Sequence, residues 1–217
     1  MNGMFERNGV IVRQSQPLAS LQKVTRVLTI DSRDRDPTKF VKVNGGAAVS
    51  DPGDYVVYLP RVYERVTAIR MKSAVIQAPS TGGGWLASDL YVLVGLEGLN
   101  RIDETAAGAD RSGYVDSSFA KLYNTSNISN AQSTSAIYYT DSGYDEQITK
   151  YTPPLGRLDR LRVTIRRHVP YGSVGLNTPT GAPITFTAGE NSFSFEIEYL
   201  DNVFDEYSSM ETRLNRS

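Results

Sequence analysis

Residues 54–77 read DYVVYLPRVYERVTAIRMKSAVIQ, and this stretch decides the fold. Apolar and polar side chains alternate in two runs, Asp54 to Pro60 and Tyr63 to Gln77. Because successive side chains of a strand point to opposite faces, each run can bury one side and expose the other. The sequence therefore predicts two strands separated by a break at Pro60-Arg61-Val62. The second strand is predicted to share one face among Ile69, Met71, Ser73 and Val75.

The rest of the 217-residue chain has the composition of one all-β domain. It holds 13 tyrosines, and valine, isoleucine and threonine are frequent in its apolar runs, which favours strands. Strands are predicted at about 24–31, 54–60, 63–77, 89–96, 117–123, 135–140, 160–167, 183–188 and 192–200. This number of short strands is that of a single jelly-roll β-sandwich. The predicted core consists of Leu28, Ile30, Val57, Leu59, Ile69, Met71, Leu93, Leu161, Val163, Ile165, Phe193, Phe195 and Ile197.

Three parts are predicted: an N-terminal arm over 1–22, the sandwich over 23–200 and a C-terminal tail over 201–217. Apolar residues of the tail recur near every third or fourth position, as on one face of a helix. Large apolar residues outside the strands need a partner. The single tryptophan, Trp85, follows a glycine run at 82–84, and its ring could either bind a partner or be buried in the core. The predicted partner interface comprises Phe5, Ile11, Trp85, Phe204, Tyr207, Met210 and Leu214. Polar spans at 100–117 and 124–135 are predicted surface loops within the region 98–150, whose role the sequence leaves open.

Composition argues against several classes of function. A net charge of −1 gives no field that would attract nucleic acid, so no direct nucleic-acid partner is expected. The absence of cysteine excludes disulfides and thiolate metal sites. No segment has the apolar length of a secretory signal or a membrane span, so synthesis and assembly in the cytoplasm are expected.

No residue set points to catalysis, a cofactor or a metal ion. His168 is the only histidine, and no serine lies in a strained glycine-x-serine-x-glycine turn, so a serine triad is not expected. The glycines at 82–84 lack the following lysine and helix of a phosphate loop. Asp31, Asp34 and Asp36 alternate as calcium ligands can, but Arg33 and Arg35 put positive charge between them. We expect a turn in which the aspartates and Ser32 cap backbone amides and the arginines pair with carboxylates.

The main local concentration of basic residues lies in the predicted strand at 160–167. Alternation places Arg160, Arg162, Thr164 and Arg166 on its outer face. Such a face could meet an acidic neighbour, or it could be a solvated face whose charges discourage edge pairing.

Several segments together resemble the minor capsid proteins of large icosahedral nucleocytoplasmic DNA viruses. They are Ile30-Asp31-Ser32-Arg33-Asp34-Arg35, Tyr55-Val56-Val57-Tyr58-Leu59-Pro60, the strand containing Val66, Ile69 and Ser73, Pro154-Leu155-Gly156-Arg157-Leu158-Asp159-Arg160-Leu161, and Phe193-Ser194-Phe195-Glu196-Ile197. Their order and spacing carry the resemblance, which covers about half of the chain.

The resemblance implies a structural, non-enzymatic jelly roll in the virion that cements larger capsomers from the inner side of the shell. The implied partners are the major capsid protein, other minor capsid proteins and the inner viral membrane surface. The alternative is a carbohydrate- or receptor-binding β-sandwich, for which the tyrosines and Trp85 would supply stacking platforms.

Overall fold

A computed structural model describes residues 5–7, 10–12, 21–44, 47–79, 84–86, 89–100, 118–124, 132–133, 136–143, 146–168, 183–187 and 189–202. The chain divides into two compact units, of which one comprises 1–24 and 200–217 and the other 25–199. In the first unit, β1 (Phe5–Arg7) pairs antiparallel with β2 (Val10–Val12), so part of the predicted arm is a short hairpin. The predicted helical tail lies outside the described residues.

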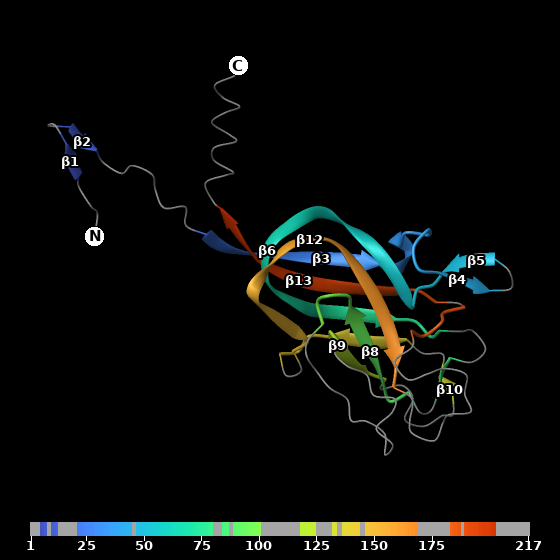
Figure 1. Cartoon of the computed structure of the whole chain (residues 1–217). Coiled ribbons are helices and arrows are strands. Elements are labelled where there is room, and N and C mark those ends of the chain that lie inside the picture. Colours follow the sequence, from blue (N-terminus) through green and yellow to red (C-terminus); the bar gives the residue numbers. More distant parts are fainter. Residues whose placement is uncertain are drawn as a thin grey trace, which may run out of the picture. The chain divides into compact units, whose positions relative to one another are not determined.

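The second unit is built on one curled, seven-stranded sheet, which Figure 1 shows in sequence colours. Its strands follow the order β3-β13-β6-β12-β8-β9, and β11 also pairs with β6. The pairings of β6 with β11, β12 and β13, and of β8 with β9 and β12, are antiparallel. The strands are β3 (Leu21–Asp31), β6 (Asp54–Ile76), β8 (Tyr91–Leu96), β9 (Ala120–Tyr123), β11 (Ile137–Thr140), β12 (Ile148–Arg167) and β13 (Asn191–Asn202).

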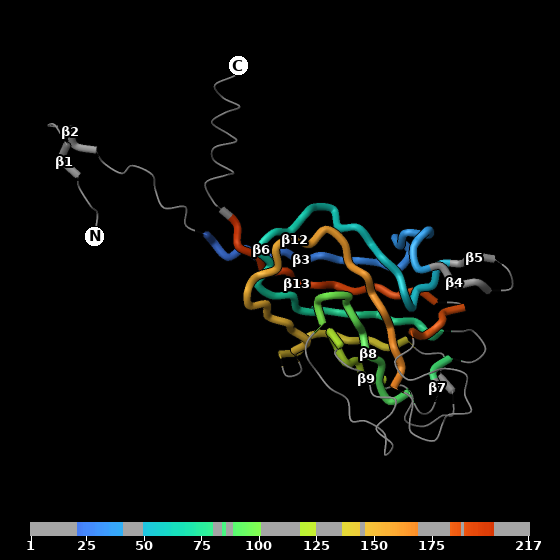
Figure 2. The backbone as a smooth tube through the Cα atoms, viewed as in Figure 1, coloured from blue at the N-terminus to red at the C-terminus, as the bar shows by residue number. Residues whose placement is uncertain are grey.

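The two longest strands, β6 and β12, make the sheet curl because each belongs to both halves of it. The second part of β6 lies between β13 on one side and β11 with the start of β12 on the other. The first part of β6 pairs with the end of β12, which continues to β8 and β9. We call these the β13 half and the β8 half. In Figure 2 both long strands bend as they pass from one half to the other.

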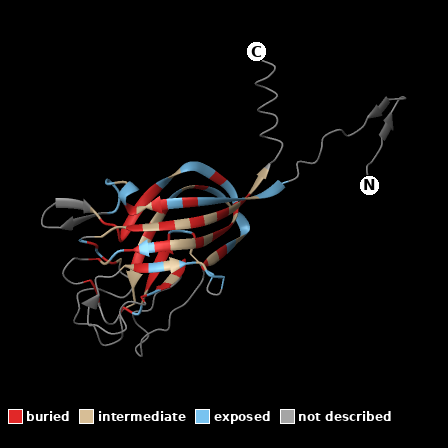
Figure 3. Cartoon of the chain, turned by 180° about the vertical axis from the view of Figure 1, so that it is seen from behind, coloured by how far each residue is buried: buried red, intermediate tan, exposed pale blue. Residues whose placement is uncertain are grey.

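The hydrophobic core lies inside this curl. Phe119, next to β9, meets Phe195 of β13 edge to face, with 5.7 Å between ring centroids, which joins the two halves. Figure 3 shows buried residues alternating with less buried ones along the strands, as period two requires. Twelve of the thirteen predicted core residues are buried, and Leu59 is the exception, being half-buried. An all-β, sandwich-like fold is therefore confirmed.

The predicted break at Pro60-Arg61-Val62 is wrong, because β6 runs through it as one strand. The ladder to β12 is nevertheless interrupted there, since Tyr58 faces Arg160 and Tyr63 faces Leu158 across the register shift. Proline has no amide hydrogen to give to a ladder, so an interruption fits this site. Leu59 lies in the interrupted segment, which explains why it is not fully buried.

The predicted shared face of the second strand is wrong in its last part. Ser73 pairs with Ser194 and Met71 with Phe195, so Lys72 is an extra residue in β6. A bulge of this kind shifts the alternation by one residue. Ala74 and Ile76 consequently point inward, and Val75 is exposed.

The remaining differences concern the ends of elements and small sheets. Strand β12 starts at Ile148, well before the predicted start at 160, and the predicted strand at 183–188 is reduced to a bridge between Pro183 and Arg166. Two unpredicted pairs are β4 (Val41–Asn44) with β5 (Ala47–Ser50) and β7 (Trp85–Leu86) with β10 (Gln132–Ser133). Within the described part of the chain, no helix has the length and apolarity to cross a membrane.

Candidate functional site

The aspartate- and arginine-rich turn is a structural cap. Asp31 Oδ1 accepts a hydrogen bond from Arg33 N at 2.9 Å at the start of the 3-10 helix η1 (Ser32–Asp34). The side chain of Arg33 bonds both carboxylate oxygens of Asp31 at 2.8 Å, and this hydrogen bond lowers the pKa of Asp31. No metal-binding cluster of acidic and histidine side chains occurs in the described residues. The prediction of a capped turn is confirmed.

The second arginine of this turn ties β3 to β13. Arg35 Nη1 lies 2.8 Å from Glu190 Oε2, and its Nε donates to Ser50 Oγ at 2.9 Å. Ser32 Oγ donates to the same Glu190 carboxylate and accepts from Asn191 N at 2.9 Å. These contacts fix the turn beside the first residue of β13, and they bind the carboxylate of Glu190 to side chains of the turn.

His168 lies at the end of β12, where its Nδ1 contacts the hydroxyl of Tyr91. The Tyr91 ring also carries the Lys121 ammonium 4.1 Å from its centroid. His168 is half-buried, and its ring lies tilted against that of Tyr91, with 5.8 Å between the ring centroids.

The predicted interface residues lie in different parts of the structure, and some lie outside the described residues. Trp85 is fully buried and packs edge to face against Phe186, with 6.3 Å between the ring centroids. Of the two predicted alternatives, burial in the core is therefore the one observed, and the ring is not presented to a partner. Phe5 and Ile11 belong to the β1–β2 hairpin, whose side chains are not described. The four tail residues Phe204, Tyr207, Met210 and Leu214 lie outside the described residues.

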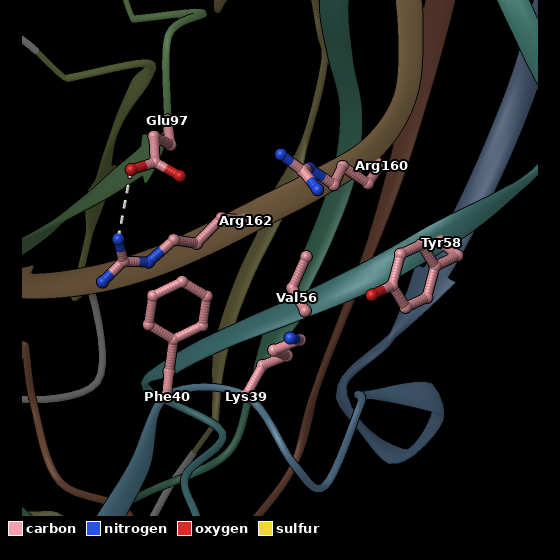
Figure 4. Close-up of a pocket in the computed structure, with 7 residues that line it drawn as sticks. All are labelled: Lys39, Phe40, Val56, Tyr58, Glu97, Arg160 and Arg162. Carbon is pink, nitrogen blue, oxygen red and sulfur yellow. Dashed lines mark hydrogen bonds and ion pairs between the residues drawn. The ribbon is translucent and has the colours of Figure 1, made fainter.

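Within the described residues, a pocket on the outer face of the β8 half is a candidate site (Figure 4). Its volume is about 310 Å³. Strand pairing builds its floor, because Val56 lies opposite Arg162 and Tyr58 opposite Arg160, and residues two apart on a strand share a face. We call it the arginine pocket, and it is lined by Lys39, Phe40, Val56, Tyr58, Glu97, Arg160 and Arg162.

Arg162 is a fixed wall of the arginine pocket. Its guanidinium bonds Asp54 through Nε at 2.9 Å and Nη2 at 3.2 Å, and Glu97 through Nη1 at 3.1 Å. The same group stacks over Phe40, 3.5 Å from the ring centroid. The hydrogen bond that Arg162 donates to Asp54 is the main cause of the raised pKa of Arg162. A cation with so many partners positions its neighbours and has little capacity for another ligand.

Arg160 and Lys39 are the available cations of the pocket. Both side chains are exposed, and for the described residues no ion pair or side-chain hydrogen bond joins either one to a carboxylate. Hydrogen bonds from Thr38 are the main cause of the lowered pKa of Asp36, and the positive charge of Lys39 contributes to it. Thr38 Oγ1 and Tyr58 also donate hydrogen bonds to Asp36, at 2.6 Å and 3.2 Å.

Part of this site was visible in the sequence. The predicted outer face of Arg160, Arg162, Thr164 and Arg166 is confirmed, because Leu161, Val163 and Ile165 between them are buried. Lys39, Phe40 and Glu97 come from turns far away in the sequence, and no local pattern connects them with β12.

Comparison with known proteins adds no function to this geometry: no protein-family model matches the chain, and no curated protein matches its sequence.

Proposed function

We propose that the chain is a structural protein of an icosahedral viral shell, a jelly roll that cements larger capsomers on the inner side. The structural observation that supports the jelly-roll part of the proposal is the strand order. In a jelly roll, the first strand lies beside the last, the last beside the third and the third beside the sixth, while the second, seventh, fourth and fifth form the other half.

Counting the two parts of β6 as the second and third strands, the orders correspond. The β13 half runs β3, β13, second part of β6, β11, and the β8 half runs first part of β6, end of β12, β8, β9. This order supports a jelly-roll fold, and jelly rolls are common in viral capsid domains and also occur in lectins and cupins. The capsid choice among them comes from the resemblance of the sequence segments.

The partners in this proposal are the major capsid protein, other minor capsid proteins and the inner viral membrane surface. A subunit of this kind has a structural role, for which no catalytic group is needed. It gains stability from neighbours that bind only its folded form. The competing function is a glycan-binding sandwich, and the burial of Trp85 removes the largest aromatic platform on which it would depend.

The test is the location of the chain in infected cells. Particles from the source virus are purified on a gradient and probed with an antibody against this chain, before and after protease treatment of intact particles. The proposal requires that the chain sediments with particles and is protected from protease. Abundant chain in the cell lysate with none in the particles would reject it. Glycan-array binding by the isolated chain would favour the competing function.

A further inference from the structure

We infer that the arginine pocket is a docking site for an acidic segment of a partner protein, in which the carboxylates of the segment are bound by Arg160 and Lys39 and an adjacent apolar side chain rests on Val56, Phe40 and Tyr58. The identity of the partner as a capsid protein rests on the proposed function. The chemistry of the pocket does not.

The charges of the lining favour an anion. Three cations and one carboxylate line the pocket, and that carboxylate, Glu97, is bonded to Arg162. Arg162 is in turn held by Asp54, so Arg160 and Lys39 remain for an incoming group. The planar guanidinium of Arg160 suits a carboxylate, because arginine can donate two parallel hydrogen bonds to its two oxygens. The Lys39 ammonium adds a second positive charge to the same lining.

The apolar part of the lining selects a peptide rather than a free ion. Phe40 and Tyr58 are both exposed, and Val56 forms a buried floor between them. An inorganic phosphate would leave these surfaces wet, whereas a carboxylate carried beside an apolar side chain covers them. A volume of about 310 Å³ accommodates one or two side chains and is at the lower end of the size of ligand sites.

The pocket is also held open before any ligand arrives. Tyr58 is oriented by its hydrogen bond to Asp36, and Phe40 by its stacking on Arg162, whose carboxylate partners come from β6 and the turn after β8. Groups that are already ordered lose little entropy on binding, which favours a short segment as a ligand.

The experiment measures the fluorescence anisotropy of a labelled peptide with the full chain. The peptide carries one phenylalanine and two adjacent aspartates between glycine spacers, and the matched peptide carries two asparagines in place of the aspartates. The variants are Lys39→Gln with Arg160→Gln together, and Arg157→Gln as control. Arg157 is also an exposed arginine of β12, but it pairs with Asp159 and does not line the pocket.

We expect the double variant to bind the acidic peptide at least about tenfold more weakly, and the control to bind it like the unchanged chain. Binding should weaken as salt rises from about 50 to about 300 mM. Equal binding of the acidic and amide peptides, equal losses in both variants, or full competition by equimolar inorganic phosphate would overturn the inference.

Particle incorporation separates this inference from the proposed function. If the chain is found in particles but the double variant binds the acidic peptide as tightly as the unchanged chain, the docking site is wrong and the structural role stands. If peptide binding follows the expected pattern but the chain is absent from particles, the pocket chemistry stands and the capsid role is wrong.

Discussion

Tyr55 of β6 donates its buried hydroxyl to Asn191 Oδ1 of β13 over 2.6 Å. Asn191 also donates through Nδ2 to the carbonyl oxygen of Pro52 at 2.8 Å and through its backbone N to Ser32 Oγ at 2.9 Å. The side-chain and backbone amides of one buried asparagine thus bond three residues that are distant from it in sequence. The hydrogen bond from Tyr55 has consequences for stability and for its dependence on pH.

Replacing Tyr55 with Phe should lower the free energy of unfolding by about 1–3 kcal/mol, because Asn191 Oδ1 stays buried and loses its donor. Urea denaturation monitored by circular dichroism measures this difference. Tyr138→Phe is the control, since that exposed tyrosine should show no change. Equal stability of the two variants would mean that the buried hydrogen bond adds nothing.

The same burial makes the fold sensitive to alkali. Desolvation raises the pKa of Tyr55 and of Tyr151, whose hydroxyl donates to the carbonyl oxygen of Leu99 at 2.9 Å. A raised folded-state pKa gives stability that is complete below the unfolded value of about 10 and is lost as pH rises above it. Thermal unfolding midpoints should therefore fall above about pH 10. In a Tyr55→Phe, Tyr151→Phe double variant, the drop of the midpoint from neutral to alkaline pH should be smaller than in the unchanged chain.

The bulge at Lys72 predicts opposite results for two residues that simple alternation places on one face. Met71→Thr should destabilise the chain by at least about 2 kcal/mol, because it removes buried apolar volume and buries a hydroxyl. Val75→Thr should stay within about 0.5 kcal/mol, because Val75 is on the exposed face beyond the bulge. Comparable losses at both positions in the same denaturation assay would contradict the bulge.

This pair also shows how far the sequence determines the fold. Period two placed Ile69, Met71, Phe193 and Phe195 inside, because a strand with one buried face needs a continuous apolar row. The inversion at Val75 depends on the register between β6 and β13, which leaves Lys72 without a partner in β13, and that is a property of two strands more than 100 residues apart. The arginine pocket follows the same division, since β12 alternation predicted Arg160 whereas Phe40 reaches it only through the tertiary fold.

The two arginines of the capped turn should differ in importance. Arg35 is mostly buried against Glu190, whereas Arg33 is 74% exposed in its pair with Asp31. Arg35→Gln should therefore cost about 1–3 kcal/mol, because it leaves Glu190 without its charged partner. Arg33→Gln should leave the denaturation midpoint unchanged, since exposed pairs add little. A larger loss of stability for Arg33→Gln than for Arg35→Gln would show that the Arg33–Asp31 pair, and not the Arg35–Glu190 pair, holds the turn in place.

The ends of the chain should matter for assembly more than for folding. Deleting 1–20 or 203–217 leaves β3 and β13 complete, so the thermal unfolding midpoint should stay close to that of the full chain. On the proposed function, both deletions should reduce incorporation into particles, because apolar residues such as Phe5 and Phe204 would lose their partner. Normal incorporation of both deletions would move the search for the interface to the loops of the region 98–150. Unfolding of either one would place that end in the core.

The passage of β6 and β12 through both halves has a consequence for how the molecule opens. A two-layer protein whose layers exchange no strands can lose one layer while the other persists, and its amides then exchange with solvent hydrogen at two separate rates. Here neither half can leave without taking along part of a strand that the other needs. Amide protons of the β13 half and the β8 half should therefore share one protection level, set by a single global opening. Pairings such as Tyr55 with Val163 join residues far apart in sequence. The chain therefore loses the entropy of closing long loops before the stabilising contacts of either half form, and refolding should be slow.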